Sequence, residues 1–307
     1  MPEKPIPIIC GPTGSGKTAA AVELAGEYPV EIVSADSRQI IRHLDIGTAK
    51  PTPEQKSMVK FHLIDLIEPG ERYCAFRFID EANEAIEDIL SRKKIPLVVG
   101  GTGLYLRALT EGVVEIEQDD MSVCEELASE MESLGPEEMY RRLTEIDPLE
   151  AAKTHPHNKV RVIRALEIFQ LTGKPKSELM ASGAYRKGRY EFEYFCLTPP
   201  RPGLYEAINR RVDRMMTDGL LEELKVLIQK GYRERIRRAN VIGYGELLDY
   251  LDGNFSLSEA VSIIKQNSRR YAKRQMTWFR RQPDCVFFED RESLLNSIDL
   301  RGWPGEK

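Results

Sequence analysis

The chain has 307 residues, enough for one large domain or for a core domain with an inserted lobe. Its 41% hydrophobic and 30% charged residues are ordinary for a globular protein, and its apolar runs are shorter than the roughly 20 residues of a membrane-spanning helix. The five cysteines form no C-x-x-C pair, and the first residues, MPEKPIPIIC, lack a signal-peptide layout. We therefore expect a cytoplasmic monomer with no membrane association, whose thiols are reduced rather than disulfide-bonded or zinc-bound.

Charge is segregated along the chain, although the net charge is only −5. Residues 111–138 carry eleven acids and no Lys or Arg, whereas residues 260–283 carry seven bases and no acid. This asymmetry is typical of a protein with a polyanionic partner on one face. A solvated helix face is the alternative interpretation.

The first predicted elements are a strand and a glycine-rich loop. Ile6–Cys10 is a short apolar strand, and the spacing of small and apolar residues after Lys17 is helical. Between them lies GPTGSGKT, which fits the phosphate-binding pattern G-x-x-x-x-G-K-[ST]. In that pattern Lys17 reaches the terminal phosphates and Thr18 holds Mg²⁺, while the helix N-terminus adds partial positive charge. A tight turn without a ligand is the alternative.

A second strand, Val30–Ser34, runs into the segment SADSRQ (34–39). Asp36 therefore lies at the carboxyl edge of the predicted sheet, where ligands bind in parallel sheets. Its carboxylate could ligate Mg²⁺, cap the next turn or act as a general base. Ser37 and Gln39 carry hydrogen-bonding groups suited to reading a base edge. A weak alternation over Phe61–Leu66 suggests a further strand.

The next elements predict a parallel sheet with crossover helices. The apolar spacing of Phe76–Leu90 is helical, and Ile95–Val99 is a continuous apolar run that ends in Gly100-Gly101. Phosphoryl-transferring enzymes with this loop place an acid after such a run to organise Mg²⁺. This chain has none there, and Asp65 is the one spare candidate, which weakens the kinase interpretation.

Strand signals disappear between Val113 and Arg189, where proline-punctuated helices predict an inserted domain. The fold class is thus α/β, with a P-loop NTPase-like parallel-sheet core (1–112 plus 190–307) and a mostly helical insertion (113–189). Glu193–Leu197 returns as a strand.

Two long helices are predicted near the C-terminal end. The first, over 203–230, places Arg211 and Arg214 three residues apart on its polar face, where they could clamp a diphosphate or simply be solvated. The second begins at the capping box of Ser256 and runs to about Arg281. It interleaves bases with Tyr271, Trp278 and Phe279, an arrangement that suits RNA, although such aromatics are more often part of a core.

Eight motifs in order closely resemble the bacterial tRNA dimethylallyltransferase family, from about residue 6 to 282. They are GPTGSGKT (11–18), SADSRQ (34–39), LDIGTAKP (44–51), IPLVVGGTGLYLRAL (95–109), RALEIFQLTGKP (164–175), INRRVDRMM (208–216), VIGYGEL (241–247) and RRYAKRQMTWFR (269–280). The resemblance implies transfer of the dimethylallyl group of dimethylallyl diphosphate to N6 of adenosine 37 of tRNA. The diphosphate would leave intact.

The resemblance also implies roles for particular residues. Asp36 would accept a proton from the N6 amine, and Arg211, Thr18 and Mg²⁺ would neutralise the diphosphate, with Arg214 as a further candidate. The diphosphate loop comprises Gly11, Pro12, Thr13, Gly14, Ser15, Gly16, Lys17 and Thr18. The tRNA-contacting positions, with Thr102 touching the flipped adenosine, are Asp36, Ser37, Arg38, Gln39, Thr102, Cys124, Val160, Arg161, Val162, Ile163, Arg164, Asn240, Val241, Ile242, Gly243, Tyr244, Gly245 and Glu246. The basic last helix would follow the phosphates of the anticodon loop.

Three positions depart from the family pattern. Ile41 stands where a Tyr is usual, Gly245 replaces a common Lys or Arg, and Cys124 falls near a tRNA-contacting Arg. Each affects a tRNA contact and leaves the diphosphate site intact.

Three other functions fit parts of the sequence. A small-molecule kinase or NTPase would share the phosphate loop but needs an acidic Mg²⁺ organiser. An isopentenyltransferase acting on free adenine nucleotides would have no need of the insertion or the basic helix. A non-catalytic RNA-binding protein with a vestigial loop would not retain Lys17, Thr18 and Asp36 together.

Overall fold

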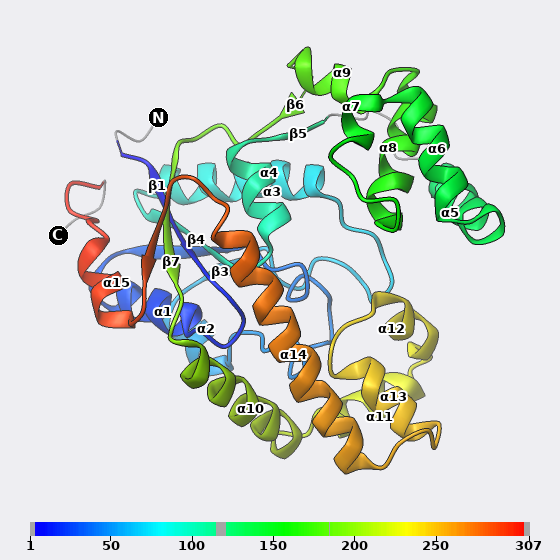
Figure 1. Ribbon diagram of the computed structural model, residues 1–307. Helices are drawn as coiled ribbons and strands as arrows, with labels where there is room; N and C mark the ends of the chain where they lie inside the picture. Colours follow the sequence, from blue (N-terminus) through cyan, green and yellow to red (C-terminus); the bar gives the residue numbers. More distant parts are fainter. Residues whose placement is uncertain (1–3, 115–120, 184, 304–307) are drawn as a thin grey trace. The chain divides into compact units, whose positions relative to one another are not determined.

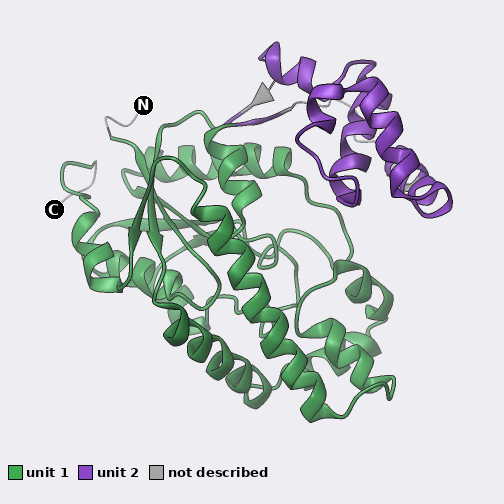
Figure 2. Ribbon diagram, viewed as in Figure 1, with its two compact units in different colours: residues 1–111, 188–307 green, residues 112–187 purple. Residues whose placement is uncertain are grey.

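The computed structural model describes residues 4–114, 121–183 and 185–303 (Figure 1). The chain divides into two compact units, shown in different colours in Figure 2. Unit 1 comprises residues 1–111 and 188–307, and unit 2 comprises residues 112–187. Each unit is described by itself below.

Unit 1 is built on a six-stranded sheet in the order β3-β2-β4-β1-β7-β8. Every pairing within it is parallel. The strands are β1 (Ile6–Cys10), β2 (Val30–Ser34), β3 (Phe61–His62), β4 (Ile95–Gly100), β7 (Phe192–Leu197) and β8 (Cys285–Phe288). The predicted α/β class with a parallel-sheet core is therefore confirmed.

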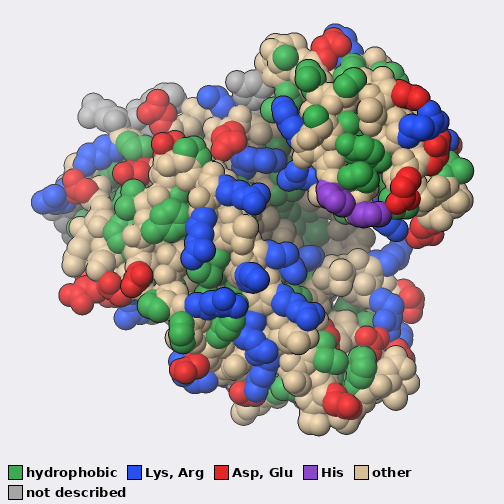
Figure 3. Space-filling view, in the orientation of Figure 1, with side chains coloured by type: hydrophobic (Ala, Val, Ile, Leu, Met, Phe, Trp, Pro, Cys, Tyr) green, Lys and Arg blue, Asp and Glu red, His purple; other side chains and the backbone are tan. Residues whose placement is uncertain are grey.

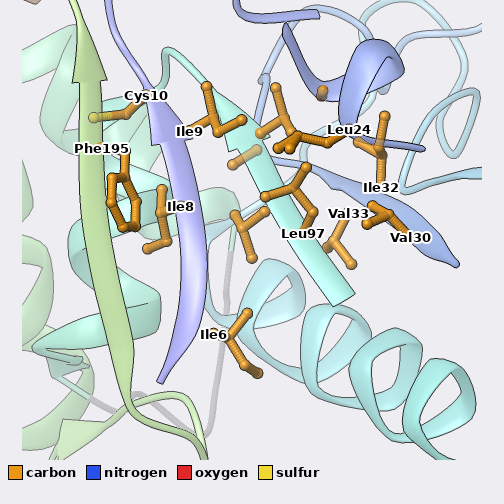
Figure 4. Packing of buried hydrophobic residues seen from close by; sticks show 14 of the residues in the cluster. Ile6, Ile8, Ile9, Cys10, Leu24, Val30, Ile32, Val33, Leu97 and Phe195 are labelled. Carbon is orange, nitrogen blue, oxygen red and sulfur yellow. The ribbon is translucent and has the colours of Figure 1, made fainter. Parts of the chain in front are cut away.

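The central strands are apolar on both faces because helices cover both sides of the sheet. All residues of β1, β2 and β4 are buried, and Figure 4 shows their side chains packed from neighbouring strands. β1 lies between β4 and β7, with Ile9 opposite Val99 and Phe195. The segments that follow β1, β2 and β4 consequently emerge at one edge of the sheet.

Ten helices of unit 1 are described. They are α1 (Lys17–Glu27), α2 (Pro53–Met58), α3 (Ala75–Ser91), α4 (Gly103–Thr110), α10 (Arg201–Thr217), α11 (Leu220–Gln229), α12 (Arg233–Ala239), α13 (Tyr244–Leu251), α14 (Leu257–Phe279) and α15 (Arg291–Ser297). The crossovers β1–α1–β2 and β2–α3–β4 run in opposite directions along the sheet, so right-handed connections place α1 and α3 on opposite faces. Helices α10 and α14 run side by side (Figure 1). A second apolar cluster joins α10, α11, α13 and the start of α14.

Several predicted elements differ from the structure. The helix expected over 203–230 is wrong, because the chain breaks between α10 and α11, where Gly219 adopts a left-handed φ of 99°. The strand expected over 61–66 covers only Phe61–His62, since Leu63 and Asp65 have φ values of 59° and 57°. Strand β8 was not predicted at all.

Unit 2 is mostly helical. Its helices are α5 (Met121–Leu134), α6 (Pro136–Ile146), α7 (Pro148–Ala151), α8 (Lys159–Thr172) and α9 (Lys176–Ala181), and its short antiparallel pair is β5 (Val113–Val114) with β6 (Tyr185–Arg186). Leu127, Met139, Leu143 and Val162 belong to its own apolar cluster. Within the described parts of both units, no helix is long and apolar enough to cross a bilayer.

Candidate active site

A cavity of about 660 Å³ opens at the carboxyl edge of the sheet in unit 1. Charged or polar side chains reach it from the loop after β1, the turn after β2, helices α10 and α14, and the segment from α12 to α13. The charged and hydroxyl-bearing residues among its walls include Thr13, Lys17, Thr18, Asp36, Arg38, Arg211, Tyr271 and Arg274. Apolar side chains of α10 (Ile208, Val212 and Met215) line the same space.

The loop Gly11–Thr18 has the geometry of a phosphate cradle. Gly14 and Gly16 have φ values of 80° and 97°, a region that glycine enters without strain. A Cβ on Gly14 would lie 2.8 Å from the Ile208 side chain, so the loop also needs glycine there for space. Helix α1 begins directly afterwards at Lys17, and its first N–H groups face the loop. Such a helix N-terminus is a ready anion site.

Two cations converge on this loop. Lys17 donates a 2.8 Å hydrogen bond from Nζ to the Pro12 carbonyl, and Arg211 donates a 3.0 Å bond from Nη1 to Thr13 Oγ1. Burial lowers the pKa of Lys17 to about 8; nearby Asp36 opposes this effect and Arg211 adds to it. Burial also lowers the pKa of Arg211, although a guanidinium stays charged near neutral pH. Two desolvated positive charges beside a phosphate loop favour a polyanionic ligand.

The second candidate cation, Arg214, lies elsewhere. It is exposed in the last turn of α10 and is not among the residues that line the cavity. Of the two interpretations left open for Arg211, its place in the cavity wall, on a helix that packs beside α14, fits the diphosphate clamp rather than a solvated side chain. Arg211 therefore lines the cavity, whereas Arg214, three residues later on the same helix, does not.

Asp36 forms a turn at the end of β2. Its Oδ1 accepts hydrogen bonds from the N–H groups of Arg38 (2.9 Å) and Gln39 (3.4 Å). Among the residues that the structure describes, no hydrogen bond or ion pair to Oδ2 is found, and Asp36 lines the cavity. One oxygen therefore caps the turn, and the other is available for chemistry in the cavity.

Thr102 holds the same turn from the neighbouring strand. It follows β4, and its Oγ1 accepts a 2.9 Å bond from the Ser37 N–H and donates to Ser37 Oγ at 3.2 Å. Its hydroxyl is thus occupied by Ser37, and Thr102 is not among the cavity-lining residues. Thr102 therefore supports the turn through Ser37, and its contact with the flipped adenosine stays a prediction.

Helix α14 closes the cavity from the opposite side through Gln275, a residue that sequence reasoning did not single out. Its Oε1 accepts a 2.8 Å bond from the Thr13 N–H, and its Nε2 donates a 2.8 Å bond to the Gly101 carbonyl. The motif RRYAKRQMTWFR (269–280) contains this residue, but the spacing of the motif does not reveal the contact.

The aromatic residues of α14 divide between core and cavity. Phe279 is fully buried, and Trp278 packs against Gly103, where a Cβ would lie 2.4 Å from the indole. Tyr271 lines the cavity, and burial, together with the charge of Asp36, raises its pKa to about 12. Tyr271 is therefore a neutral hydroxyl at physiological pH, and it alone of the three is placed to contact a ligand there.

The segment 240–246 borders the cavity. Asn240, in a left-handed conformation with φ 47°, lines it together with Ile242, Gly245 and Glu246. Arg38 connects this segment to the Asp36 turn by donating a 2.9 Å bond to the Ala239 carbonyl.

Other members of the segment have packing roles. Tyr244 is fully buried, and its hydroxyl accepts a bond from the Gly47 N–H at 3.1 Å and donates to Glu223 at 2.5 Å. Val241 is almost entirely buried, although it also forms part of the cavity wall, and Gly243 precedes α13 with φ 102°. Any RNA contact from this segment would come from its more exposed members.

Asp65, the spare Mg²⁺ candidate, is not at the cavity. Its Oδ1 contacts the buried ammonium of Lys50, which also donates to the Ile41 carbonyl (2.6 Å) and to Asp45 (2.7 Å). Lys50 thereby fixes the DIGTAKP loop, and Asp65 serves as its counter-ion. Of the departures from the family pattern, Ile41 is a buried core residue, whereas Gly245 leaves open space beside the cavity.

The residues present fit a divalent cation bound with a diphosphate. Thr18, the predicted metal ligand, lines the cavity with Asp36 also in its wall, and Ser15 Oγ is a buried hydroxyl without a hydrogen-bond partner in the described structure. Hydroxyl and carboxylate oxygens together with substrate phosphates are the ligand set that Mg²⁺ prefers.

The remaining predicted positions belong to unit 2. Val160 and Arg161 are exposed in the first turn of α8, and Val162 is buried in the cluster of that unit. Ile163 packs partly against the same cluster, and Arg164 pairs with Glu167 at 2.9 Å. Cys124 lies half-buried on α5.

The exposed face of α14 is strongly basic. Figure 3 shows Lys and Arg side chains gathered over the face along which α14 runs in Figure 1. Arg270, Lys273, Arg274 and Arg280 are exposed on or directly after this helix. The neighbouring Lys265 pairs with Asp213 at 2.5 Å instead. No ion pair of these four bases with another described residue is found, and such a group of exposed bases suits a nucleic-acid backbone.

Comparisons with known proteins show the family of this chain. The family model described as IPP transferase matches residues 39–282, and one described as Isopentenyl transferase matches residues 4–66. The chain is 44% identical to tRNA dimethylallyltransferase 1 of Syntrophotalea carbinolica, over 96% of this chain and 95% of that relative. It is also 44% identical to tRNA dimethylallyltransferase of Thermotoga neapolitana, over 95% of each protein.

Solved structures give the same result. The tRNA isopentenylpyrophosphate transferase of Bacillus halodurans is 40% identical, with a TM-score of 0.67 over 96% of this chain and 95% of that one. A eukaryotic dimethylallyltransferase described as acting on tRNA is 30% identical, with a TM-score of 0.80 over 93% of this chain and 74% of that one. With a phosphate loop, a free carboxylate and two partly buried cations in one cavity, and with relatives that match along nearly its whole length, this chain belongs to the IPP transferase family of tRNA dimethylallyltransferases.

Proposed function

We propose that this chain transfers the dimethylallyl group of dimethylallyl diphosphate to N6 of adenosine 37 of tRNA and releases diphosphate. A C–N bond forms between N6 and the terminal allylic carbon, and the bond from that carbon to the diphosphate oxygen breaks. The observation that carries this proposal is the convergence of Lys17, Arg211 and Asp36 on one cavity, in a chain whose named relatives are tRNA dimethylallyltransferases.

Loss of the leaving group is assisted by positive charge that is already in place. The loop N–H groups, Lys17 and Arg211 would surround the diphosphate, and the bonds of the two side chains to Pro12 and Thr13 hold them at the loop before the donor binds. Mg²⁺, held by Thr18 with Asp36 nearby, would supply further charge neutralisation when bound. The apolar walls from Ile208, Val212 and Met215 suit a hydrocarbon chain of five carbons.

The acceptor amine is a weak nucleophile, so position and proton removal matter most. Asp36 Oδ1 is fixed by the N–H groups of Arg38 and Gln39, which aims the free Oδ2 at the cavity as the general base for the N6 proton. Thr102 holds the turn through Ser37. An adenosine in a single-stranded anticodon loop leaves its stack at low cost, so it can enter the cavity.

The acceptor would be held by three surfaces. We propose that the exposed bases of α14 bind phosphates of the anticodon stem and loop, and that Gln39, Asn240 and Glu246 contact the loop at the cavity. Val160 and Arg161 of unit 2 are proposed as further contacts because both are exposed.

The test is mass spectrometry of the nuclease fragments of an unmodified tRNA transcript after incubation with the protein, Mg²⁺ and dimethylallyl diphosphate, with AMP and ATP as control substrates. The expected product carries one C5H8 unit on adenosine 37, and a matched transcript with guanosine at that position should remain unmodified. Prenylated AMP in place of prenylated tRNA would instead identify a free-nucleotide enzyme. ATP consumption without any adduct would identify a kinase or NTPase.

A further inference from the structure

Three of the five cysteines, scattered in sequence, come together on one face of the sheet. Cys10 ends β1, Cys196 lies near the end of β7, and Cys285 begins β8. Cys10 pairs directly with Cys196, and Cys285 pairs with Tyr194, two residues before Cys196. Because side chains alternate along a strand, this register places all three thiols on the same face.

The sulfur atoms are close enough to share one ion. All three lie within 4.8 Å of one another, and Cys10 Sγ is 3.9 Å from Cys285 Sγ. Two thiolates on a tetrahedral zinc ion are about 3.8 Å apart, because each Zn–S bond is about 2.3 Å long. Figure 4 shows the sulfur of Cys10 directed toward β7, which lies between β1 and β8 in the sheet.

A disulfide is a poor explanation for the Cys10–Cys285 approach. Strand β7 lies between β1 and β8, so their backbones are about 10 Å apart at the usual strand spacing of about 4.8 Å. A disulfide requires Cα atoms within about 7 Å. A metal ion, by contrast, adds two long bonds between the sulfurs and needs no movement of the strands.

We propose that Cys10, Cys196 and Cys285 form a binding site for a thiophilic d¹⁰ metal ion of the Zn²⁺ class. Soft thiolates select such ions over Mg²⁺, so the site is chemically separate from the oxygen ligands of the cavity. Each thiolate that binds the ion releases its proton to solvent. Three protein ligands leave one position for water, and Cys285, half-buried on the edge strand, provides the entry route.

The site connects to the rest of the fold through the strand ends. Cys10 directly precedes Gly11 of the phosphate loop, and a Cβ on Gly11 would lie 2.3 Å from the Leu197 carbonyl, next to Cys196. An ion bound to the three sulfurs ties β1, β7 and β8 together at the point where the phosphate loop begins. Its expected effect is therefore a higher melting temperature.

The experiment uses the full chain in the reduced state, with Cd²⁺ as the probe. The double variant Cys74→Ala/Cys124→Ala retains only the three clustered thiols, because the remaining cysteines are the exposed Cys74 and the half-buried Cys124. We expect one Cd²⁺ per chain, seen as a thiolate-to-metal charge-transfer band and displaced by Zn²⁺. Adding Cys285→Ala, a change on an edge strand, should weaken Cd²⁺ binding at least about 100-fold, since even outer partners of a metal site contribute 10- to 100-fold.

A band that is absent from the double variant, or that Cys285→Ala leaves unchanged, would overturn the proposal and leave the three thiols as small apolar packing groups. X-ray absorption of the Zn²⁺-loaded double variant gives a second test that does not depend on the folding of a Cys285 variant. Three sulfur scatterers support the site, and fewer contradict it. Neither measurement uses donor or tRNA, so its result is independent of the proposed prenyl transfer.

Discussion

The Gln275 side chain on α14 accepts a 2.8 Å hydrogen bond from the Thr13 N–H of the phosphate loop, a residue 262 positions earlier in the chain. The same amide donates to the Gly101 carbonyl at 2.8 Å and is almost completely buried. One side chain of the basic helix therefore sets the distance between two loops that border the cavity. A change in α14 can act on the donor site without touching the donor.

Replacing Gln275 tests this connection. Gln275→Ala leaves the Thr13 N–H and the Gly101 carbonyl without a partner, each worth about 1 kcal/mol in a typical hydrogen bond. We expect KM for dimethylallyl diphosphate to rise about tenfold while the dissociation constant for tRNA changes little. Steady-state kinetics and a tRNA-binding titration measure the two effects. Gln266→Ala, on an exposed position of the same helix, is the matched control. An equal loss of donor and tRNA affinity would mean that Gln275 supports the fold as a whole.

Asp36→Asn tests the proton acceptor. The amide oxygen can still accept from the Arg38 and Gln39 N–H groups, so the turn should persist. Loss of a general base is expected to lower the single-turnover rate about 100- to 10,000-fold, with donor and tRNA binding retained. Asp284→Asn, on an exposed residue outside the cavity, should behave as the wild type. A single-turnover rate within about twofold of wild type would remove Asp36 from the proton transfer.

The pH dependence of donor binding reports on Lys17. Burial lowers the pKa of Lys17 to about 8 in the free protein, so its ammonium loses its charge as pH rises through that value. The diphosphate requires the charged form, and donor affinity should therefore be constant below pH 8 and fall at higher pH. Titration of donor affinity from pH 6 to 10 checks the midpoint. Lys17→Arg should keep its charge across this range, and a fall in its donor affinity with the same midpoint would assign the titration to another group.

Glu31 lies at the end of β2 opposite to Asp36, and it is the basis of a prediction about stability. Its side chain is 2% exposed, and its carboxylate accepts from Arg92, Lys94 and His62, each with a contact of 2.7 Å. Burial alone would raise its pKa, but these partners hold the pKa well below the ordinary 4.5. Because the pKa of Glu31 is lower in the folded protein, its carboxylate stabilises the fold at pH values above its unfolded-state pKa of about 4.5. This stabilisation is lost as the pH falls below that value.

Glu31→Gln removes that charge. Because Arg92 and Lys94 are partly exposed, we expect the free energy of unfolding to fall by only about 2 kcal/mol at pH 7. The difference from wild type should shrink as the pH is lowered below about 4.5. Denaturant unfolding at pH 7 and pH 4 measures both values, with Glu84→Gln, an exposed acid in the middle of α3, as the control. A difference that is independent of pH would mean that shape, rather than charge, is responsible.

The parts of the fold that depend on local pattern could be predicted from the sequence. Continuous apolar runs identified Ile6–Cys10 and Ile95–Val99 because strands buried on both faces have no polar alternation. The Ser256 capping box marked the start of α14 because its hydrogen bonds are local.

Features that depend on tertiary context could not be predicted. Helices α10 and α11 both pack into one apolar cluster, which includes Val212 and Leu224. The helical spacing of apolar residues therefore continues across the break at Gly219 and hides it. Strand β8 has the sequence CVFF and lies at the sheet edge, and a run of only four apolar residues is too short to identify a strand by periodicity.

The candidate site shows the same division. The loop Gly11–Thr18 and Asp36 were found because their pattern carries the chemistry. Gln275 and the Lys50–Asp65 pair were missed because hydrogen-bond partners far apart in sequence leave no spacing to recognise. The cysteine cluster was missed for the same reason, since strand order, rather than sequence distance, brings its three members together.

The fate of the diphosphate tests the central claim most directly. Unmodified tRNA is incubated with the protein, Mg²⁺ and dimethylallyl diphosphate, and released phosphate species are counted against prenylated adenosine 37. The account predicts one intact diphosphate for each dimethylallyl group on tRNA, with no requirement for ATP. Release of orthophosphate, or a phosphorylated product without a prenyl adduct, would contradict it.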